Sequence, residues 1–330
     1  MTHAADLPAD LHAPGARSAR ATGVAAGVAA ALSQPPLLLG VDFSCAPSRR
    51  KPITVARGRR EGEGQGTGEG RGAGEGQGED KGQGQGQGHG AVRLLGIDAL
   101  PTLAQFESAL AAPGPWFGAF DFPFGLPRAF VDAHALGDSA DAVIAELKRR
   151  CPARMQFRAL VDAWGNARAS GQRLIHRRTD TAHAATSSSP LQTRYVPVGF
   201  MYYEGFARLV AAGLMLPGLR SGDAARVGVE GYPGRLAFEL IGRRSYKNRD
   251  DSERRAAREE MLAALERGRS PLGLALRLGA SERAAIVADA SGDLIDAVLC
   301  LMQAAWAERQ PRHGLPEVVD GVEGWIVGPV

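Results

Sequence analysis

The chain has 330 residues, 44% of them hydrophobic, and its 39 Lys and Arg against 36 Asp and Glu residues give a formal charge of +3. This composition excludes collagen, coiled-coil and wholly disordered chains, and so balanced a charge selects no class of partner by itself. Glycine is concentrated in one segment, because 15 of the 43 glycines lie within residues 58–90. The rest of the chain beyond residue 34 is long enough to bury one large core or two small ones.

The first 34 residues predict a disordered tail, because they combine Ala, Gly, Pro and scattered charges without periodicity. The Ala- and Gly-rich stretch 21–32 has too little bulky apolar mass for a signal peptide, and no apolar run reaches the ~20 residues that cross a bilayer. Cys45, Cys151 and Cys300 form no C-x-x-C pair, which favours a reducing compartment. We therefore expect a soluble, cytoplasmic protein with no membrane partner and no obligate protein partner.

From residue 35 to 330 the pattern predicts one domain that opens with three strands. The apolar run 37–44 ends in a polar tip, as expected of a buried strand whose end reaches a surface site. Residues 52–57 and 91–98 predict two more strands of an antiparallel meander. Residues 58–90 alternate Gly with polar residues, which predicts a flexible insertion in the hairpin loop.

Helices dominate the predicted middle of the chain. A short helix is expected over 102–111. A second apolar run, over 116–122, predicts a strand whose end carries the carboxylate Asp121. Residues 128–225 predict a mainly helical insertion that includes a polar loop at 174–190. A strand over 226–232 follows, with Glu230 near its end.

The last third of the chain predicts a further set of helices. A charged helix over 252–267 is expected to be capped by Ser252, and the next helix by Ser281, with a restart near residues 291–292. The run 293–306 is strongly helical and mostly apolar. Its two acids, three residues apart, share one face.

Carboxylates occupy corresponding places in this pattern. Asp42, Asp121 and Glu230 stand near the ends of three strands, and Asp293 and Asp296 stand in the first turn of the last long helix. Singly, such acids are turn or cap residues or stabilise a helix N-terminus. Together at one sheet edge they repel one another unless a cation neutralises them. An all-oxygen set favours Mg²⁺ or Mn²⁺, and two such ions about 3.5–4 Å apart support in-line phosphodiester cleavage.

The order of elements is that of a ribonuclease H-like domain, an α/β fold with a mixed five-stranded sheet flanked by helices and, here, a helical insertion. Six short motifs occur along it: Gly40–Ser44, Phe120–Pro127, Glu230–Pro233, Tyr246–Lys247, Asp293–Ala297 and Glu323–Ile326. Through these motifs the chain resembles, over roughly residues 37–330 apart from the insertion, the uncharacterised bacterial and archaeal family of predicted ribonuclease H-like nucleases, domain of unknown function 429.

The resemblance implies a metal-dependent nuclease whose substrate is DNA or RNA. It implies that Asp42 lies between two ions, that Asp121 and Glu230 are further ligands or neighbouring acids, and that Asp296 with Asp293 supplies ligands from the last helix. Lys247 is then a catalytic contact to the phosphate or the transition state. The chain departs from the family pattern in two places. Gly234 stands where an acidic or small residue is expected, and residues 290–292 lack an Asp that related sequences often carry there. Weaker metal affinity is therefore expected.

Three further residues are candidates for substrate binding. Arg177 and Arg178 lie on the polar loop, from which their guanidinium groups could grip a phosphate in bidentate fashion. The alternative is that this loop is simply exposed and charged. Ser44, at the polar tip of the first strand, is the third candidate.

Two other functions remain open at the level of sequence. The acidic edge could serve a non-catalytic binding or scaffold module, through a structural metal or a protein contact. A phosphotransferase of the actin-like ATPase type is less favoured, because such proteins need Gly-rich phosphate loops and the chain has Ser44-Cys45-Ala46-Pro47 after Asp42.

Overall fold

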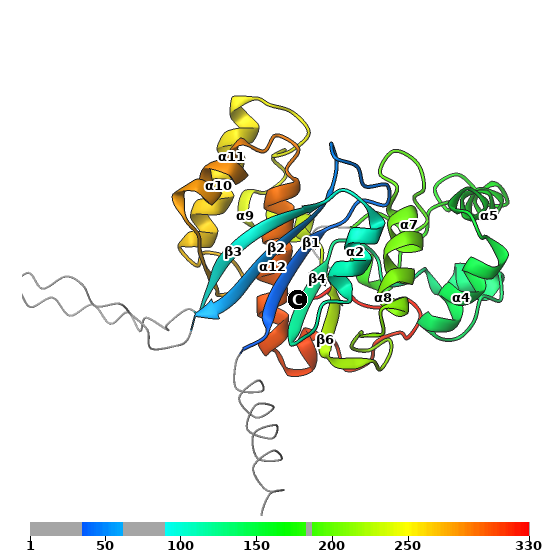
Figure 1. Cartoon of the computed structure of the whole chain (residues 1–330). Helices are drawn as coiled ribbons and strands as arrows, with labels where there is room; N and C mark the ends of the chain where they lie inside the picture. Colours follow the sequence, from blue (N-terminus) through cyan, green and yellow to red (C-terminus); the bar gives the residue numbers. More distant parts are fainter. Residues whose placement is uncertain (1–34, 62–89, 183–186, 330) are drawn as a thin grey trace, which may run out of the picture. The chain divides into compact units, whose positions relative to one another are not determined.

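A seven-stranded mixed sheet forms the centre of the protein, in the order β5-β6-β4-β1-β2-β3-β7 (Figure 1). The structure is a computed structural model that describes residues 35–61, 90–182 and 187–329, and from Pro36 onward the chain forms one unit with its own core. The predicted tail at 1–34 and most of the predicted glycine-rich insertion, at 62–89, lie outside the described residues. In the described part of the chain no helix is long and apolar enough to cross a membrane.

The five longer strands agree with the predicted α/β order. The first three form the expected antiparallel meander, and the other two run parallel to the first. Their bounds are β1 (Leu37–Asp42), β2 (Ile53–Glu61), β3 (Ala91–Leu100), β4 (Trp116–Phe120) and β6 (Asp223–Glu230). The parallel strands β1, β4 and β6 therefore end at the same edge of the sheet.

The prediction of five strands is wrong in number, because a short parallel strand is added at each edge. These are β5 (Leu214–Met215) beside β6 and β7 (Ala275–Arg277) beside β3. Runs of two and three residues are too short to show a strand period in the sequence. β5 also means that the segment 128–225 is not wholly helical, and β6 already begins at Asp223.

The insertion in the hairpin begins later than predicted. β2 continues to Glu61, so residues 58–61 belong to the ladder with β3 rather than to a flexible loop. Arg60 stabilises this extension, because its Nε donates to a carboxylate oxygen of Glu308 at 3.0 Å. The end of β2 could not be recognised from the sequence, because it resembles the Gly-rich segment that follows and its partners in β3 and Glu308 lie far along the chain.

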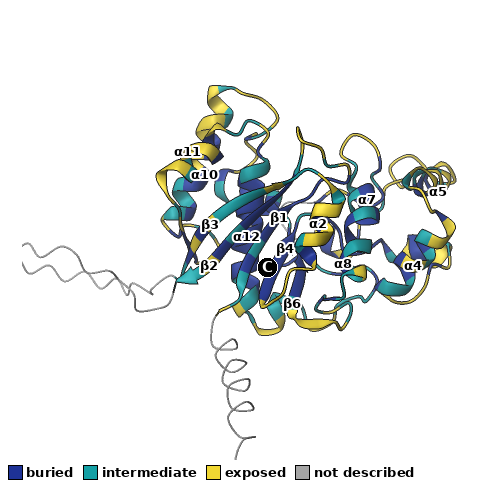
Figure 2. Ribbon diagram, in the orientation of Figure 1, coloured by how far each residue is buried: buried dark blue, intermediate teal, exposed yellow. Residues whose placement is uncertain are grey.

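Helices cover both faces of the sheet and bury two apolar clusters (Figure 2). One face packs against α9 (Pro233–Ile241), α10 (Ser252–Glu266), α11 (Ala280–Ala288) and α12 (Asp293–Arg309). The other, rich in aromatic rings, packs against α2 (Leu103–Leu110), α3 (Arg128–Ala133), α4 (Ala140–Arg150), α5 (Arg154–Asn166), α7 (Val198–Met201), the π-helical turn Tyr202–Phe206 and α8 (Ala207–Ala211). In β1 and β4 alternate residues enter opposite clusters, as a strand period of two requires.

The last long helix lies directly on β1. A Cβ on Gly40 would stand 2.0 Å from the backbone nitrogen of Leu301 and 2.1 Å from the carbonyl oxygen of Ala297. Only glycine therefore allows this approach, which places the first turn of α12 beside the end of β1.

Two predicted helix caps are wrong, and one helix boundary is confirmed. α10 is capped by Asp251, whose side chain accepts from the backbone N–H of Arg254, rather than by Ser252. α11 begins at Ala280, so Ser281 lies inside it. The restart near residues 291–292 is confirmed, because α12 begins at Asp293 after a left-handed Gly292.

Candidate metal centre

Three of the predicted acids come together at the edge where the parallel strands end. Asp42, Asp121 and Asp296 each offer a carboxylate oxygen, and these oxygens lie within 4.8 Å of one another. Asp42 is the last residue of β1, Asp121 follows β4, and the backbone N–H of Asp121 donates to the carbonyl of Val41 at 2.9 Å. Asp296 lies in the first turn of α12. Neighbouring parallel strands and one helix start therefore build the group.

The turn before α12 sets the position of Asp296. Gly292 has a left-handed φ of 81°, and a Cβ there would lie 2.5 Å from the Cβ of Lys247. The Asp289 carboxylate accepts from the backbone N–H groups of Ser291 and Leu294, at 3.0 and 2.9 Å. This turn thus brings the helix start against the loop that carries Lys247.

The carboxylates of the group are held where negative charge is costly. Burial raises the pKa of Asp42 well above its usual value, and the neighbouring charges of Asp296, Asp121 and Asp293 raise it further. Burial, followed by the charge of Asp296, raises the pKa of Asp121 to about 7. Such a group favours any cation that can enter among the oxygens.

The third acid already has two protein partners. Asp296 accepts a hydrogen bond from the Tyr246 hydroxyl at 2.6 Å and one from the Lys247 ammonium at 2.5 Å. Burial by itself lowers the pKa of Lys247, but Asp296, Tyr246 and Asp121 together outweigh this and hold that pKa above its usual value. The buried Arg258 donates to the carbonyl of Tyr246 at 2.6 Å and so fixes the loop. Because the Lys247 side chain is 40% exposed, its ammonium can also reach a bound group.

Acidic neighbours surround Asp42 and Asp121: the charge of Asp296 raises the pKa of both carboxyls, and Lys247 opposes that rise. Carboxylates that converge in this way repel one another unless a cation neutralises them. Hard oxygen ligands are what Mg²⁺ and Mn²⁺ prefer, so the donor set fits these ions. The convergence of the three carboxylates is the strongest structural argument for a cation at this edge.

Glu230 lies outside this group, although it ends the next parallel strand. Its two carboxylate oxygens accept from the Arg177 guanidinium at 2.6 and 2.8 Å, and one of them also accepts from the backbone N–H of Phe124 at 2.9 Å. Burial raises the pKa of Glu230, and Arg177 opposes that rise. The structure therefore pairs Glu230 with a cation of the protein itself.

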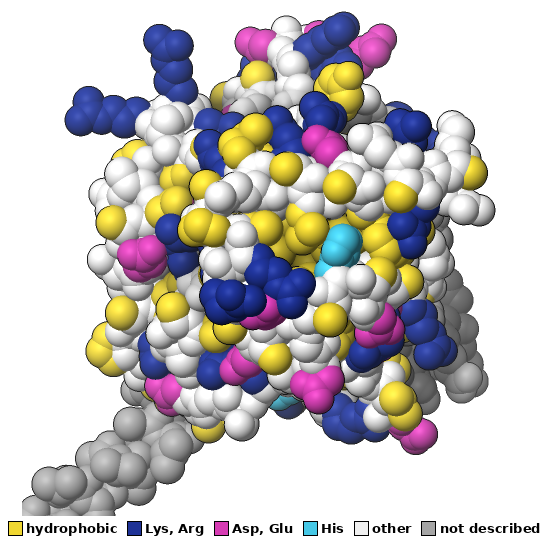
Figure 3. All heavy atoms as spheres, turned by 90° about the vertical axis from the view of Figure 1, so that its right-hand side faces the viewer, with side chains coloured by type: hydrophobic (Ala, Val, Ile, Leu, Met, Phe, Trp, Pro, Cys, Tyr) yellow, Lys and Arg dark blue, Asp and Glu magenta, His cyan; other side chains and the backbone are white. Residues whose placement is uncertain are grey.

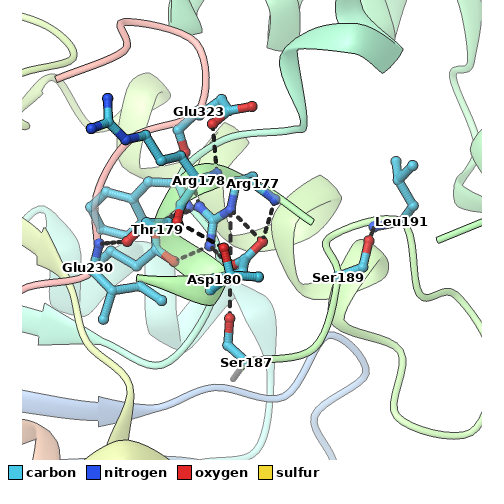
Figure 4. A network of polar contacts seen from close by, with 12 residues as sticks. Arg177, Arg178, Thr179, Asp180, Ser187, Ser189, Leu191, Glu230 and Glu323 are labelled. Atoms are coloured by element: carbon cyan, nitrogen blue, oxygen red, sulfur yellow. Dashed lines mark hydrogen bonds and ion pairs between the residues drawn. The ribbon is translucent and has the colours of Figure 1, made fainter. Parts of the chain in front are cut away.

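Arg177 is buried and does not project from an exposed loop (Figure 4). Its five N–H donors are all engaged, by the carboxylates of Asp180 and Glu230 and by the carbonyl of Glu323. Arg177 thus has no donor left for a phosphate, which corrects the predicted grip. The sequence also gave no role to Asp180, for which the Arg-x-x-Asp spacing at the start of α6 (Arg178–Thr181) was the available signal.

The remaining predicted residues lie around the group rather than in it. Arg178 is exposed and its backbone N–H donates to Glu323, so its guanidinium is free to move in solvent. Asp293 is near enough to raise the pKa of Asp42, but its carboxylate is not one of the three that converge. Ser44 is buried and is not among the residues that line the adjacent cavity.

That cavity, of ≈ 160 Å³, opens beside the acidic group and was not foreseen from the sequence. Asp121 and Lys247 form part of its wall, and so do the paired side chains of Arg177 and Glu230. On the face shown in Figure 3, which carries α4 and α5, basic and acidic side chains are interspersed. That face therefore carries no broad band of one sign of charge.

Comparison with known proteins adds no relative: no family model, no curated protein and no solved structure matches the chain.

Proposed function

We propose that the protein is a divalent-metal-dependent nuclease of ribonuclease H-like fold that hydrolyses phosphodiester bonds in DNA or RNA. The observation that carries the proposal is the convergence of Asp42, Asp121 and Asp296, whose carboxylate oxygens lie within 4.8 Å of one another. A phosphodiester is the substrate that such a centre serves best, because its charge is neutralised by the same cations.

The sheet supports the fold assignment. Its five longer strands lie in the order β6-β4-β1-β2-β3, with an antiparallel meander followed by two parallel strands, and α12 packs across β1. This order, with three of the five predicted acids converging at one edge of the sheet, supports the proposal of a ribonuclease H-like fold. The short edge strands extend that arrangement without interrupting it.

In the proposed site Asp42, Asp121 and Asp296 hold Mg²⁺ or Mn²⁺, with Asp42 central. When bound, two such ions activate a water for in-line attack and stabilise the leaving oxygen. Lys247, held by Asp296 at 2.5 Å, donates a second N–H to a phosphate oxygen of the substrate. Tyr246 keeps the Asp296 carboxylate oriented, and Asp293 adds negative charge at the rim.

The test combines metal titration with cleavage of nucleic acids. Calorimetry with Mg²⁺ and Mn²⁺ is run on the wild type, on Asp42→Asn and on Asp98→Asn, a control that removes a half-exposed carboxylate on β3. Single-stranded, duplex, hybrid and branched substrates are then screened for cleavage. We expect metal binding and cleavage in the wild type and the control, and the loss of both in folded Asp42→Asn. If the wild type binds no divalent cation, even with nucleic acid present, the proposal is wrong.

The ion pair between Lys247 and Asp296 favours a second candidate, a non-catalytic ribonuclease H-like scaffold. In that case the lysine supplies the cation that the acidic edge requires. Lys247→Met distinguishes the two. If the protein is a scaffold, Lys247→Met lowers its stability and does not increase its metal binding. If it is the nuclease, Lys247→Met keeps its metal affinity and loses cleavage. A phosphotransferase stays a weaker prediction.

A further inference from the structure

The cavity beside the acidic group has walls suited to a flat apolar group. Its apolar lining comes from Val196, Val198, Met201 and Ile326, together with the ring of Tyr232. Two of its charged lining residues, Arg177 and Glu230, neutralise each other through hydrogen bonds. A bound group therefore meets apolar surface and the paired charges of Arg177 and Glu230, with Asp121 and Lys247 on the side next to the acidic group.

The size of the cavity restricts what it can hold. At ≈ 160 Å³ it is close to the ~150 Å³ cavity that accommodates one benzene ring, and smaller than the ~300 Å³ at which drug-sized sites begin. Its wall includes Asp121 of the acidic group and Lys247, the partner of Asp296, so an occupant lies next to the proposed reacting phosphate. The ring-sized group attached to a nucleic-acid phosphate through one sugar is a base.

A fully exposed aromatic residue is the chain neighbour of a residue that lines the cavity. Tyr195 is 99% exposed and has a left-handed φ of 60°, and the adjacent Val196, 59% exposed, lines the cavity. Bulky residues adopt this backbone conformation only where the surroundings enforce it. An exposed ring on an enforced turn is a surface on which a base can stack.

Hydrogen bonds hold that turn in place. The backbone N–H of Gly199 donates to the carbonyl of Gln192 at 2.7 Å, and Arg158 donates to the carbonyl of Thr193. A Cβ on Gly199 would lie 2.6 Å from the carbonyl oxygen of Pro190, so the chain is closely packed there. The loop thus presents Tyr195 rather than letting it collapse onto the protein.

We infer that the cavity is a subsite for one unpaired nucleobase next to the scissile phosphate, and that Tyr195 stacks on a neighbouring base, so the substrate class is single-stranded or locally unpaired nucleic acid. This inference rests on the nuclease proposed above. A paired base is stacked within its duplex and cannot enter a one-ring cavity unless it is unpaired first.

Binding without turnover tests the subsite. In the Asp42→Asn background, fluorescence anisotropy is measured with a labelled single-stranded oligodeoxynucleotide, with its duplex, and with an abasic strand of equal length and charge at one salt concentration. We expect the base-containing single strand to bind about tenfold more tightly than the other two. Equal affinity for the abasic strand, or no binding at all, overturns the inference.

Two pairs of variants locate the contact. Tyr195→Ala is expected to weaken single-strand binding about tenfold, whereas Tyr195→Phe keeps it because the ring remains. Val198→Phe fills the cavity and is expected to weaken binding, whereas the same change at the 80% exposed Val318, outside the cavity, leaves binding unchanged. Binding that is indifferent to Tyr195→Ala and Val198→Phe overturns the subsite.

The two proposals fail separately. If binding depends on the bases but the wild type cleaves no nucleic acid, the subsite proposal stands and the nuclease proposal is wrong. Metal-dependent cleavage that proceeds equally on abasic and base-containing strands retains the nuclease and removes the subsite.

Discussion

Asp121 and Glu230 end neighbouring parallel strands, yet their carboxylates have different partners. Glu230 is neutralised by Arg177 at 2.6 Å, whereas burial and the charge of Asp296 raise the pKa of Asp121, and Lys247 opposes that rise. The sequence predicted both as members of one acidic edge. It could not separate them, because the arginine that pairs with Glu230 lies 53 positions away and is brought in by a loop.

At the residue scale the pKa of Asp121 makes metal affinity depend on pH. Protons compete with the cation for a carboxylate whose pKa is raised to about 7, and Asp42 is shifted in the same direction. Affinity for Mg²⁺ is therefore expected to rise by at least about tenfold per pH unit from about pH 5 to 7. Calorimetry at pH 6 and pH 8, in buffers of different ionisation enthalpy, measures both the affinity and the protons released. A dissociation constant that does not change with pH contradicts this assignment.

At the element scale the contact between β1 and α12 decides where the acids meet. Gly40→Ala would place a methyl group 2.0 Å from the backbone of Leu301, and backbone atoms cannot move aside as a flexible side chain can. We expect a loss of about 1–3 kcal/mol or more in the free energy of unfolding. Weaker metal binding should accompany it, because the helix that carries Asp296 is displaced.

Denaturant unfolding and metal titration of the same variant check this expectation. Gly321→Ala is the matched control, because a Cβ there meets nothing within 4 Å. If Gly40→Ala is as stable as this control, the close approach of the helix to β1 does not hold.

Elements that are long apolar runs could be predicted from the sequence. Elements that form only by pairing with distant strands could not. β1, β4 and α12 were expected because each is a strongly apolar run ending or beginning at an acid, and these three position Asp42, Asp121 and Asp296. β5 and β7 escaped prediction, since two or three residues form a strand only against a neighbour that already exists. The cavity is likewise assembled from segments spread between Asp121 and Ile326.

At the scale of the whole molecule, the site should lower the stability of the metal-free protein. A carboxyl whose pKa is raised in the folded state favours folding while protonated, so its contribution is present below about pH 4 and is lost as the pH rises through about 7 for Asp121. In EDTA at pH 8, Asp42→Asn is therefore expected to melt at a higher temperature than the wild type, because one buried charge is removed.

Divalent metal should reverse that order. Mg²⁺ at about 100 times its dissociation constant stabilises a one-site protein by about 2.7 kcal/mol, so the wild type gains and Asp42→Asn does not. Thermal unfolding of both proteins at pH 5 and pH 8, with EDTA or Mg²⁺, measures the crossover. At pH 5 the two proteins should differ less, since protons already neutralise the carboxylates. A wild type that is more stable than Asp42→Asn in EDTA at pH 8 would mean that Lys247 alone balances the acidic edge, and the scaffold function would then be favoured.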